Sequence, residues 1–161
     1  MSIIAGFHSG HDCSFCILED GVPIIHAELE RYIRLKEPID DSLKFLFKEY
    51  TDFDKIEHFT TGIDIWNGGP KNRYPDTWKQ MLDISNKNNG KYHEFGHHLS
   101  HAANAFYSSN FDEALIITID GGGEEPTTDR LLMCNFAVYF GNDNKVYKID
   151  AFDDHGQGDR K

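Results

Sequence analysis

Short apolar runs, separated by polar turns that contain glycine, dominate the pattern of this chain. Strands are expected at these runs, and three further segments place apolar residues at helical spacing, so the pattern predicts a mixed α and β fold. The turn Glu19-Asp20-Gly21 is typical of a β-hairpin. The expected strands are residues 2–7, 13–18, 22–29, 56–65, 114–120, 131–139 and 145–152.

Helix signals lie between these runs. Asp40-Asp41-Ser42 is a good N-terminal cap and precedes an apolar stripe that ends at Tyr50. A second helix is expected over residues 97–107 and a short one over 76–84. The rest of residues 66–90 is rich in glycine, proline and asparagine, so we expect an insertion or a loop that faces the substrate.

The order of elements repeats one plan. Each half opens with a strand, a glycine-containing turn, a second strand, a hairpin and a third strand; the two turns are Ser9-Gly10-His11-Asp12 and Asp120-Gly121-Gly122-Gly123. A phosphate-binding turn after the first strand of each half is the plan of the actin-like ATPase (ribonuclease H-like) fold. We therefore expect one complete subdomain with its linking helix over residues 1–109, and the first three strands of a second over 110–161.

A metal site is the main chemical candidate. His97 and His101 are four residues apart, which places them on one helix face with Cβ atoms roughly 6 Å apart, while His98 faces away. Asp120 ends the next strand and offers a hard oxygen ligand. The glycines after it leave backbone N–H groups open to a phosphate.

Charge and cysteine content narrow the function classes. The net charge of −11 argues against nonspecific binding to nucleic acid or to an anionic membrane. The sequence opens without a signal peptide and has no long apolar run, so we expect a cytoplasmic protein. Cys13 and Cys16 form a C-x-x-C pair, but residues three apart in a strand point to opposite faces, which disfavours a zinc or redox site.

Four segments of the chain resemble the O-carbamoyltransferases of the nodulation-protein and antibiotic-biosynthesis type. They are Gly10–Ser14, Glu28–Lys36, His97–Ala102 and Thr118–Glu124, in the order in which that family carries them. The resemblance implies a biosynthetic enzyme that forms a carbamoyl-adenylate and pyrophosphate from carbamoyl phosphate and ATP. It then moves the carbamoyl group to a hydroxyl of a sugar or another small acceptor.

The resemblance also implies roles for individual residues. His97, His101 and Asp120 match ligands of a divalent metal, which is iron in the best-known relatives, with magnesium or manganese as alternatives. His11 and Lys36 match catalytic positions that contact the reacting phosphate or carbamoyl group. Residues expected to bind phosphate or substrate are Gly10, Asp12, Arg31, Arg34, Gly121, Gly122 and Gly123.

Two other functions remain open. Family members continue for several hundred residues, with a further aspartate ligand and a separate adenylate-forming domain, and Glu37-Pro38 replaces their usual His-Asp. The chain alone would then be a noncatalytic module that binds a nucleotide or a partner. Alternatively, the three metal ligands would serve an ATP-independent metallohydrolase. An unfinished second half also predicts a homodimer or a missing C-terminal half as a partner.

Overall fold

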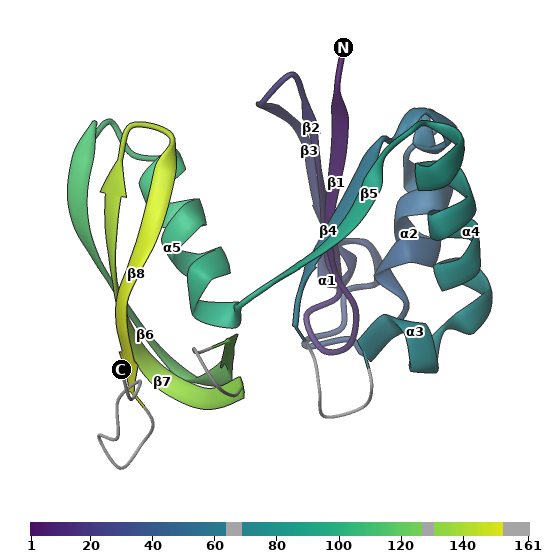
Figure 1. Ribbon diagram of the computed structural model, residues 1–161. Helices are drawn as coiled ribbons and strands as arrows, with labels where there is room; N and C mark the ends of the chain where they lie inside the picture. Colours follow the sequence, from purple (N-terminus) through teal and green to yellow (C-terminus); the bar gives the residue numbers. More distant parts are fainter. Residues whose placement is uncertain (64–68, 127–130, 153–161) are drawn as a thin grey trace. The chain divides into compact units, whose positions relative to one another are not determined.

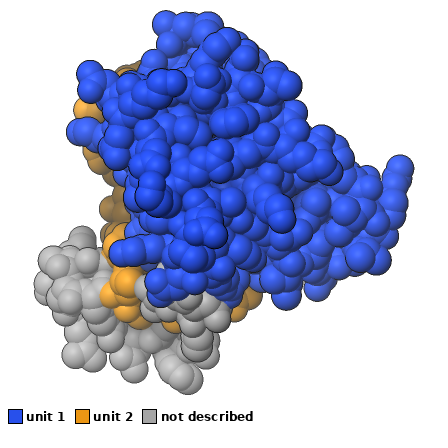
Figure 2. All heavy atoms as spheres, turned by 90° about the vertical axis from the view of Figure 1, so that its right-hand side faces the viewer, with its two compact units in different colours: residues 1–94 blue, residues 95–161 orange. Residues whose placement is uncertain are grey.

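The computed structural model describes residues 1–63, 69–126 and 131–152 and divides the chain into two compact units. The first unit is Met1–Glu94 and the second is Phe95–Lys161, coloured separately in Figure 2. The predicted subdomains meet at residues 109 and 110, whereas the compact units meet at residues 94 and 95. The helix expected to link the subdomains makes its contacts with the strands that follow it.

A five-stranded sheet forms the centre of the first unit, with strand order β3-β2-β1-β4-β5 (Figure 1). β1 pairs antiparallel with β2 and parallel with β4. The predicted hairpin turn is confirmed, since Asp20 and Gly21 have the positive φ values, 47° and 83°, that a tight two-residue turn requires. The strands are β1 (Ile3–His8), β2 (Ser14–Glu19), β3 (Val22–Glu28), β4 (His58–Gly62) and β5 (Lys91–Phe95).

Helices pack on this sheet, with α2 and α4 side by side (Figure 1). Asp41 caps α2 as predicted, because its Oδ1 accepts hydrogen bonds from the backbone N–H groups of Leu43 and Lys44. None of the helices in the described ranges combines the length and apolarity needed to cross a membrane. The helical elements are α1 (Leu29–Ile33), α2 (Ser42–Glu49), the 3-10 turn η1 (Phe53–Lys55), α3 (Gly69–Arg73) and α4 (Pro75–Lys87).

Gly90 allows the chain to pass directly over the backbone of the first unit. A Cβ atom at this position would lie 1.5 Å from the carbonyl oxygen of Glu57, a backbone atom that cannot rotate away. We expect Gly90→Ala to lower the free energy of unfolding by about 2 kcal/mol, as overpacking does. Urea denaturation measures this loss.

Gly6→Ala is the matched control in the same unit. Its Cβ would meet the Thr60 methyl at 3.7 Å, an ordinary contact, so we expect a change within about 0.5 kcal/mol. Equal urea midpoints for Gly90→Ala and Gly6→Ala would contradict the assigned role of Gly90.

The second unit packs α5 (His97–Tyr107) on a three-stranded antiparallel sheet of order β6-β7-β8. Ala102 and Phe106 of the helix bury against Ala137 and Tyr139 of the sheet. The face of this sheet opposite α5 carries exposed apolar side chains, with Ile119 78% exposed. The expected homodimer or partner stays a prediction. The strands are β6 (Glu113–Pro126), β7 (Leu131–Asn142) and β8 (Lys145–Phe152).

The predicted glycine turn after Asp120 is wrong, because β6 runs through it. Ile119 pairs with Phe136 and Gly123 pairs with Cys134, so residues 120–122 lie opposite Asn135 alone. This arrangement is a bulge, and the Asn135 amide closes it by donating to the Gly121 carbonyl at 2.8 Å. Pairing then continues to Pro126 and Leu131, which makes β6 longer than expected.

Candidate metal centre

α5 presents two imidazoles on one face, as the four-residue spacing predicts. The rings of His97 and His101 have centroids 4.7 Å apart, and their Nε2 atoms lie 3.1 Å apart. Both side chains are partly open to solvent, 34% for His97 and 53% for His101. A small ion therefore has access to both ring nitrogens.

Asp120 brings a carboxylate to the same point from the start of the bulge in β6. Its Oδ2 atom lies 2.6 Å from Nε2 of His97 and 3.1 Å from Nε2 of His101. One ligand atom from each residue falls within 4.8 Å of the others. The structure thus brings together the three residues that the sequence indicated as ligands.

The surroundings of Asp120 favour its charged form. The pKa of Asp120 is lowered to about 2, mainly by the hydrogen bond from His97, with smaller contributions from the backbone N–H of Gly121, the charge on His97 and the hydrogen bond from His101. Partial burial acts in the opposite direction and is weaker. Asp120 is therefore a carboxylate at neutral pH, which is the form that binds a cation.

The three glycines after Asp120 have different surroundings. A Cβ at Gly123 would lie 2.1 Å from Cγ of His97, so Gly123 makes room for the His97 imidazole. Gly122 has φ +143°, a conformation that side chains rarely adopt, whereas a Cβ at Gly121 would meet nothing within 4 Å. Phosphate binding by these glycines stays a prediction, but Gly123 has a packing role that the sequence did not indicate.

His98 points into the core of the second unit, as expected for a residue facing away from the pair. It is fully buried, with Nδ1 hydrogen-bonded to the Thr118 hydroxyl at 2.8 Å. Its Nε2 donates to the carbonyl of Cys134 at 2.7 Å. Both ring nitrogens are satisfied, so His98 anchors α5 to β6 and β7.

The predicted catalytic residues of the first unit lie on exposed polar surface. His11 follows β1 at the first turn, and its Nδ1 lies 2.8 Å from the carboxylate of Asp12. Lys36 is 87% exposed, with Nζ 3.4 Å from Glu30. Both His11 and Lys36 are themselves exposed to solvent, so each can exchange its acidic partner for a substrate at little cost.

The other candidate phosphate ligands of the first unit have partners of their own. Gly10 has φ +115° and exchanges two backbone hydrogen bonds with Asp40, and its expected role in phosphate or substrate binding stays a prediction. Arg31 pairs with Glu28 at 2.9 Å, and Arg34 ends α1 in a left-handed conformation. These contacts organise the polar segment that follows β3.

Arg73 is a basic residue at the first turn that the sequence did not indicate. A Cβ at Gly10 would lie 3.1 Å from its Nη1 atom, so the guanidinium of α3 rests against the turn. The sequence predicts an irregular loop around Arg73, and a single arginine in a loop does not indicate that it lies beside this turn. Arg73 therefore joins His11 as a group beside the turn.

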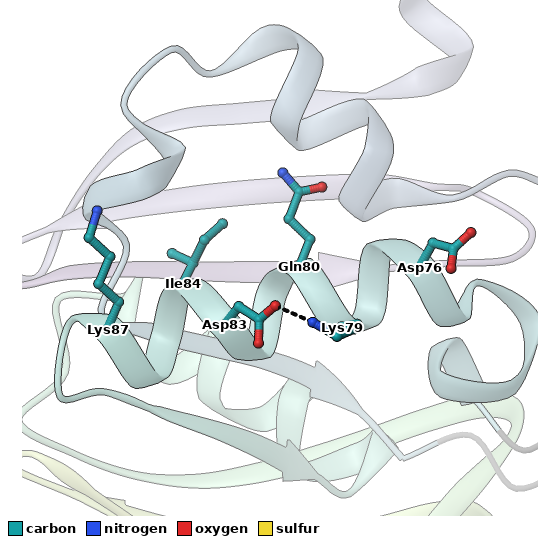
Figure 3. Close-up of a pocket in the computed structure, with 6 residues that line it drawn as sticks. All are labelled: Asp76, Lys79, Gln80, Asp83, Ile84 and Lys87. Carbon is teal, nitrogen blue, oxygen red and sulfur yellow. Dashed lines mark hydrogen bonds and ion pairs between the residues drawn. The ribbon is translucent and has the colours of Figure 1, made fainter.

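A surface hollow of about 330 Å³ runs along α4 (Figure 3). The ion pair between Lys79 and Asp83, 2.6 Å long, lies along this hollow, and all of its lining side chains come from this one helix. It is the outer surface of a helix and brings together no groups from different elements. The lining residues are Asp76, Lys79, Gln80, Asp83, Ile84 and Lys87.

Curated relatives match most of this chain with a small part of their own length. An uncharacterized protein of Methanocaldococcus jannaschii is 28% identical, and the match covers 76% of this chain and 23% of that protein. Nodulation protein NolNO of Sinorhizobium fredii is 31% identical, with 71% of this chain and 20% of that protein covered. The chain thus spans about a fifth of the length of these relatives. No protein-family model matches it.

Among solved structures, HypF of T. kodakarensis has a similar fold. The TM-score is 0.59 at 16% identity, and the match covers 94% of this chain and 19% of that one. At this identity the likeness concerns the fold alone. The predicted mixed α and β architecture is confirmed, and the likeness supports the actin-like ATPase type; the arrangement into subdomains stays a prediction. The chain is thus similar in sequence to nodulation protein NolNO and in fold to a segment of HypF.

Proposed function

We propose that this chain is the N-terminal part of an ATP- and metal-dependent O-carbamoyltransferase. The observation that carries the proposal is the convergence of His97, His101 and Asp120 on one point, within 4.8 Å of one another. The similarity to nodulation protein NolNO supports it, because the resemblance to nodulation-type carbamoyltransferases includes these three residues.

The donor set fits a divalent cation. Two imidazole nitrogens and one carboxylate oxygen suit iron, manganese and several other divalent ions, and three protein ligands leave positions for substrate oxygens. A bound cation would neutralise charge on phosphate oxygens and orient them. The lowered pKa of Asp120 keeps this ligand charged across the neutral range.

In the proposed transfer step, an acceptor hydroxyl oxygen forms a bond to the carbamoyl carbon of a carbamoyl-adenylate. The bond from that carbon to the phosphate oxygen breaks, and AMP leaves with the electron pair. His11 takes the hydroxyl proton as a general base. Lys36 stabilises the negative charge that develops on the leaving phosphate.

The proposal is tested first by metal binding and then by carbamoyl phosphate binding. We expect the chain to bind Mn²⁺ in calorimetry and, in a separate titration, to bind carbamoyl phosphate. Lys36→Ala is expected to weaken that binding about 10-fold, as loss of a hydrogen bond between charged groups does. Lys48→Ala is the matched control, because Lys48 is also exposed and lies 3.5 Å from its acidic neighbour Glu49.

The outcomes separate the three functions. Metal binding with carbamoyl phosphate binding that depends on Lys36 supports the carbamoyltransferase. Metal-dependent hydrolysis of phosphate esters without ATP would favour the metallohydrolase instead. A chain that binds no metal would leave the noncatalytic module as the better description and would overturn the proposal.

A further inference from the structure

The first turn of α5 receives its cap from a distant strand. Its N-cap residue, Gly96, has no side chain, so the backbone N–H groups that begin the helix need another acceptor. Glu125 of β6 supplies it, because its Oε2 accepts from the N–H of His98 at 3.0 Å and of Leu99 at 3.3 Å. The carboxylate is 2% exposed, so water does not compete for these bonds.

The other carboxylate oxygen of Glu125 is fixed as well. The hydroxyl of Tyr139, a fully buried residue of β7, donates to Oε1 at 2.6 Å. Burial raises the pKa of Tyr139, and its contact with Glu125 raises the pKa further, so the phenol remains a donor. Because both carboxylate oxygens are hydrogen-bonded, the sheet fixes the position of Glu125, and Glu125 in turn fixes the first turn of α5.

Two close approaches join β6 to the residues around His97. A Cβ at Gly96 would lie 2.3 Å from Oε2 of Glu125, and a Cβ at Gly123 would lie 2.1 Å from Cγ of His97. The strand segment 123–125 thus contacts the start of α5 through both the His97 ring and the helix backbone. The same strand carries Asp120 just before it.

We infer that Glu125 is a positioning residue for the metal centre: it holds the first turn of α5 so that Nε2 of His97 faces Asp120. Glu125 contributes no ligand atom to the cluster of three. The inference rests on the proposed function, because it assigns Glu125 a role toward the metal that His97, His101 and Asp120 would hold.

The test measures Mn²⁺ affinity and backbone amide exchange in the same variants. Glu125→Ala is expected to speed exchange at His98 and Leu99 in the metal-free chain and to weaken Mn²⁺ binding at least about 10-fold. Glu125→Gln keeps an acceptor oxygen for the two N–H groups, so it is expected to restore affinity to within about 3-fold of the wild type. This rescue by the conservative variant distinguishes positioning from a requirement for charge.

Val146→Ala controls for a general loss of stability. Val146 packs against the core of the second unit but makes none of the contacts described for Glu125, so its truncation is expected to leave Mn²⁺ affinity unchanged. Where Glu125→Ala fails to fold, Tyr139→Phe removes only the hydroxyl that fixes Oε1, and we expect a measurable loss of affinity from it.

Each result supports or overturns the inference. If Glu125→Ala folds and binds Mn²⁺ like the wild type, the positioning role is overturned but the proposed function is not. If Glu125→Ala does not fold, wild-type affinity in Tyr139→Phe has the same meaning. An affinity lost equally in Val146→Ala overturns it too, because the loss then reflects stability. Wild-type protein that binds no Mn²⁺ overturns the proposed function and, with it, this inference.

Discussion

Asp120→Asn is expected to weaken Mn²⁺ binding by at least about 100-fold, because substituting a residue that only supports a metal ligand already lowers metal affinity about 10- to 100-fold. The substitution removes the one negative charge of the three-residue cluster while keeping the shape of the side chain. It also replaces a group whose low pKa, about 2, keeps it ionised at neutral pH. Isothermal calorimetry with Mn²⁺ at neutral pH measures the change.

Asp112→Asn is the matched control for this prediction. Asp112 is exposed in the same unit and lies outside the three-residue cluster, so the same change of charge should leave the affinity within about 2-fold. His101→Ala should give a loss similar to that of Asp120→Asn. Tight binding that survives in a folded Asp120→Asn variant would show that the metal is held elsewhere.

The geometry of the three-residue cluster His97, His101 and Asp120 follows more directly from the sequence than the rest of the candidate site, for a physical reason. The spacing of His97 and His101 is local, and helix geometry alone places the two rings together. Asp120 ends an apolar run, so its position at the edge of a buried strand segment also follows from a local pattern. The structure brings Asp120 of the strand to both imidazoles of the helix, and metal binding by the three residues stays a prediction.

The glycine segment shows where local pattern fails. A run of three glycines is typical of a turn, but here pairing with β7 resumes at Gly123 and continues to Pro126. Glu125 reaches the start of α5 and Tyr139, contacts that no short sequence window contains. Tertiary contacts therefore decide between turn and bulge at this position.

In the first unit, the contacts that sequence reasoning missed are also long-range. The N–H of Gly10 bonds to Asp40, thirty positions later in the chain, and Arg73 approaches the same turn from α3. The polar strand β5 and the short helices α1 and α3 lack strong periodicity of their own. Their formation follows from the sheet and helices around them rather than from their own patterns.

Gly123→Ala is expected to displace His97 and to weaken Mn²⁺ binding about 30-fold, within the range for groups that orient a metal ligand. The added Cβ would lie 2.1 Å from Cγ and 2.5 Å from Cβ of His97. Because the Cβ of His97 is attached directly to the helix backbone, rotation of the ring cannot relieve the contact, and α5 must shift. Calorimetry with Mn²⁺ again measures the loss.

Gly121→Ala is the matched control for Gly123→Ala, because a Cβ at Gly121 meets nothing within 4 Å and the residue has no positive φ. It should bind Mn²⁺ within about 2-fold of the wild type, because the added methyl group points into open space and the backbone N–H that bonds to Asp120 is kept. Equal losses in the two variants would indicate that the glycines act together through backbone flexibility. A loss confined to Gly123→Ala shows that this glycine is required because the His97 imidazole occupies the space of its missing side chain.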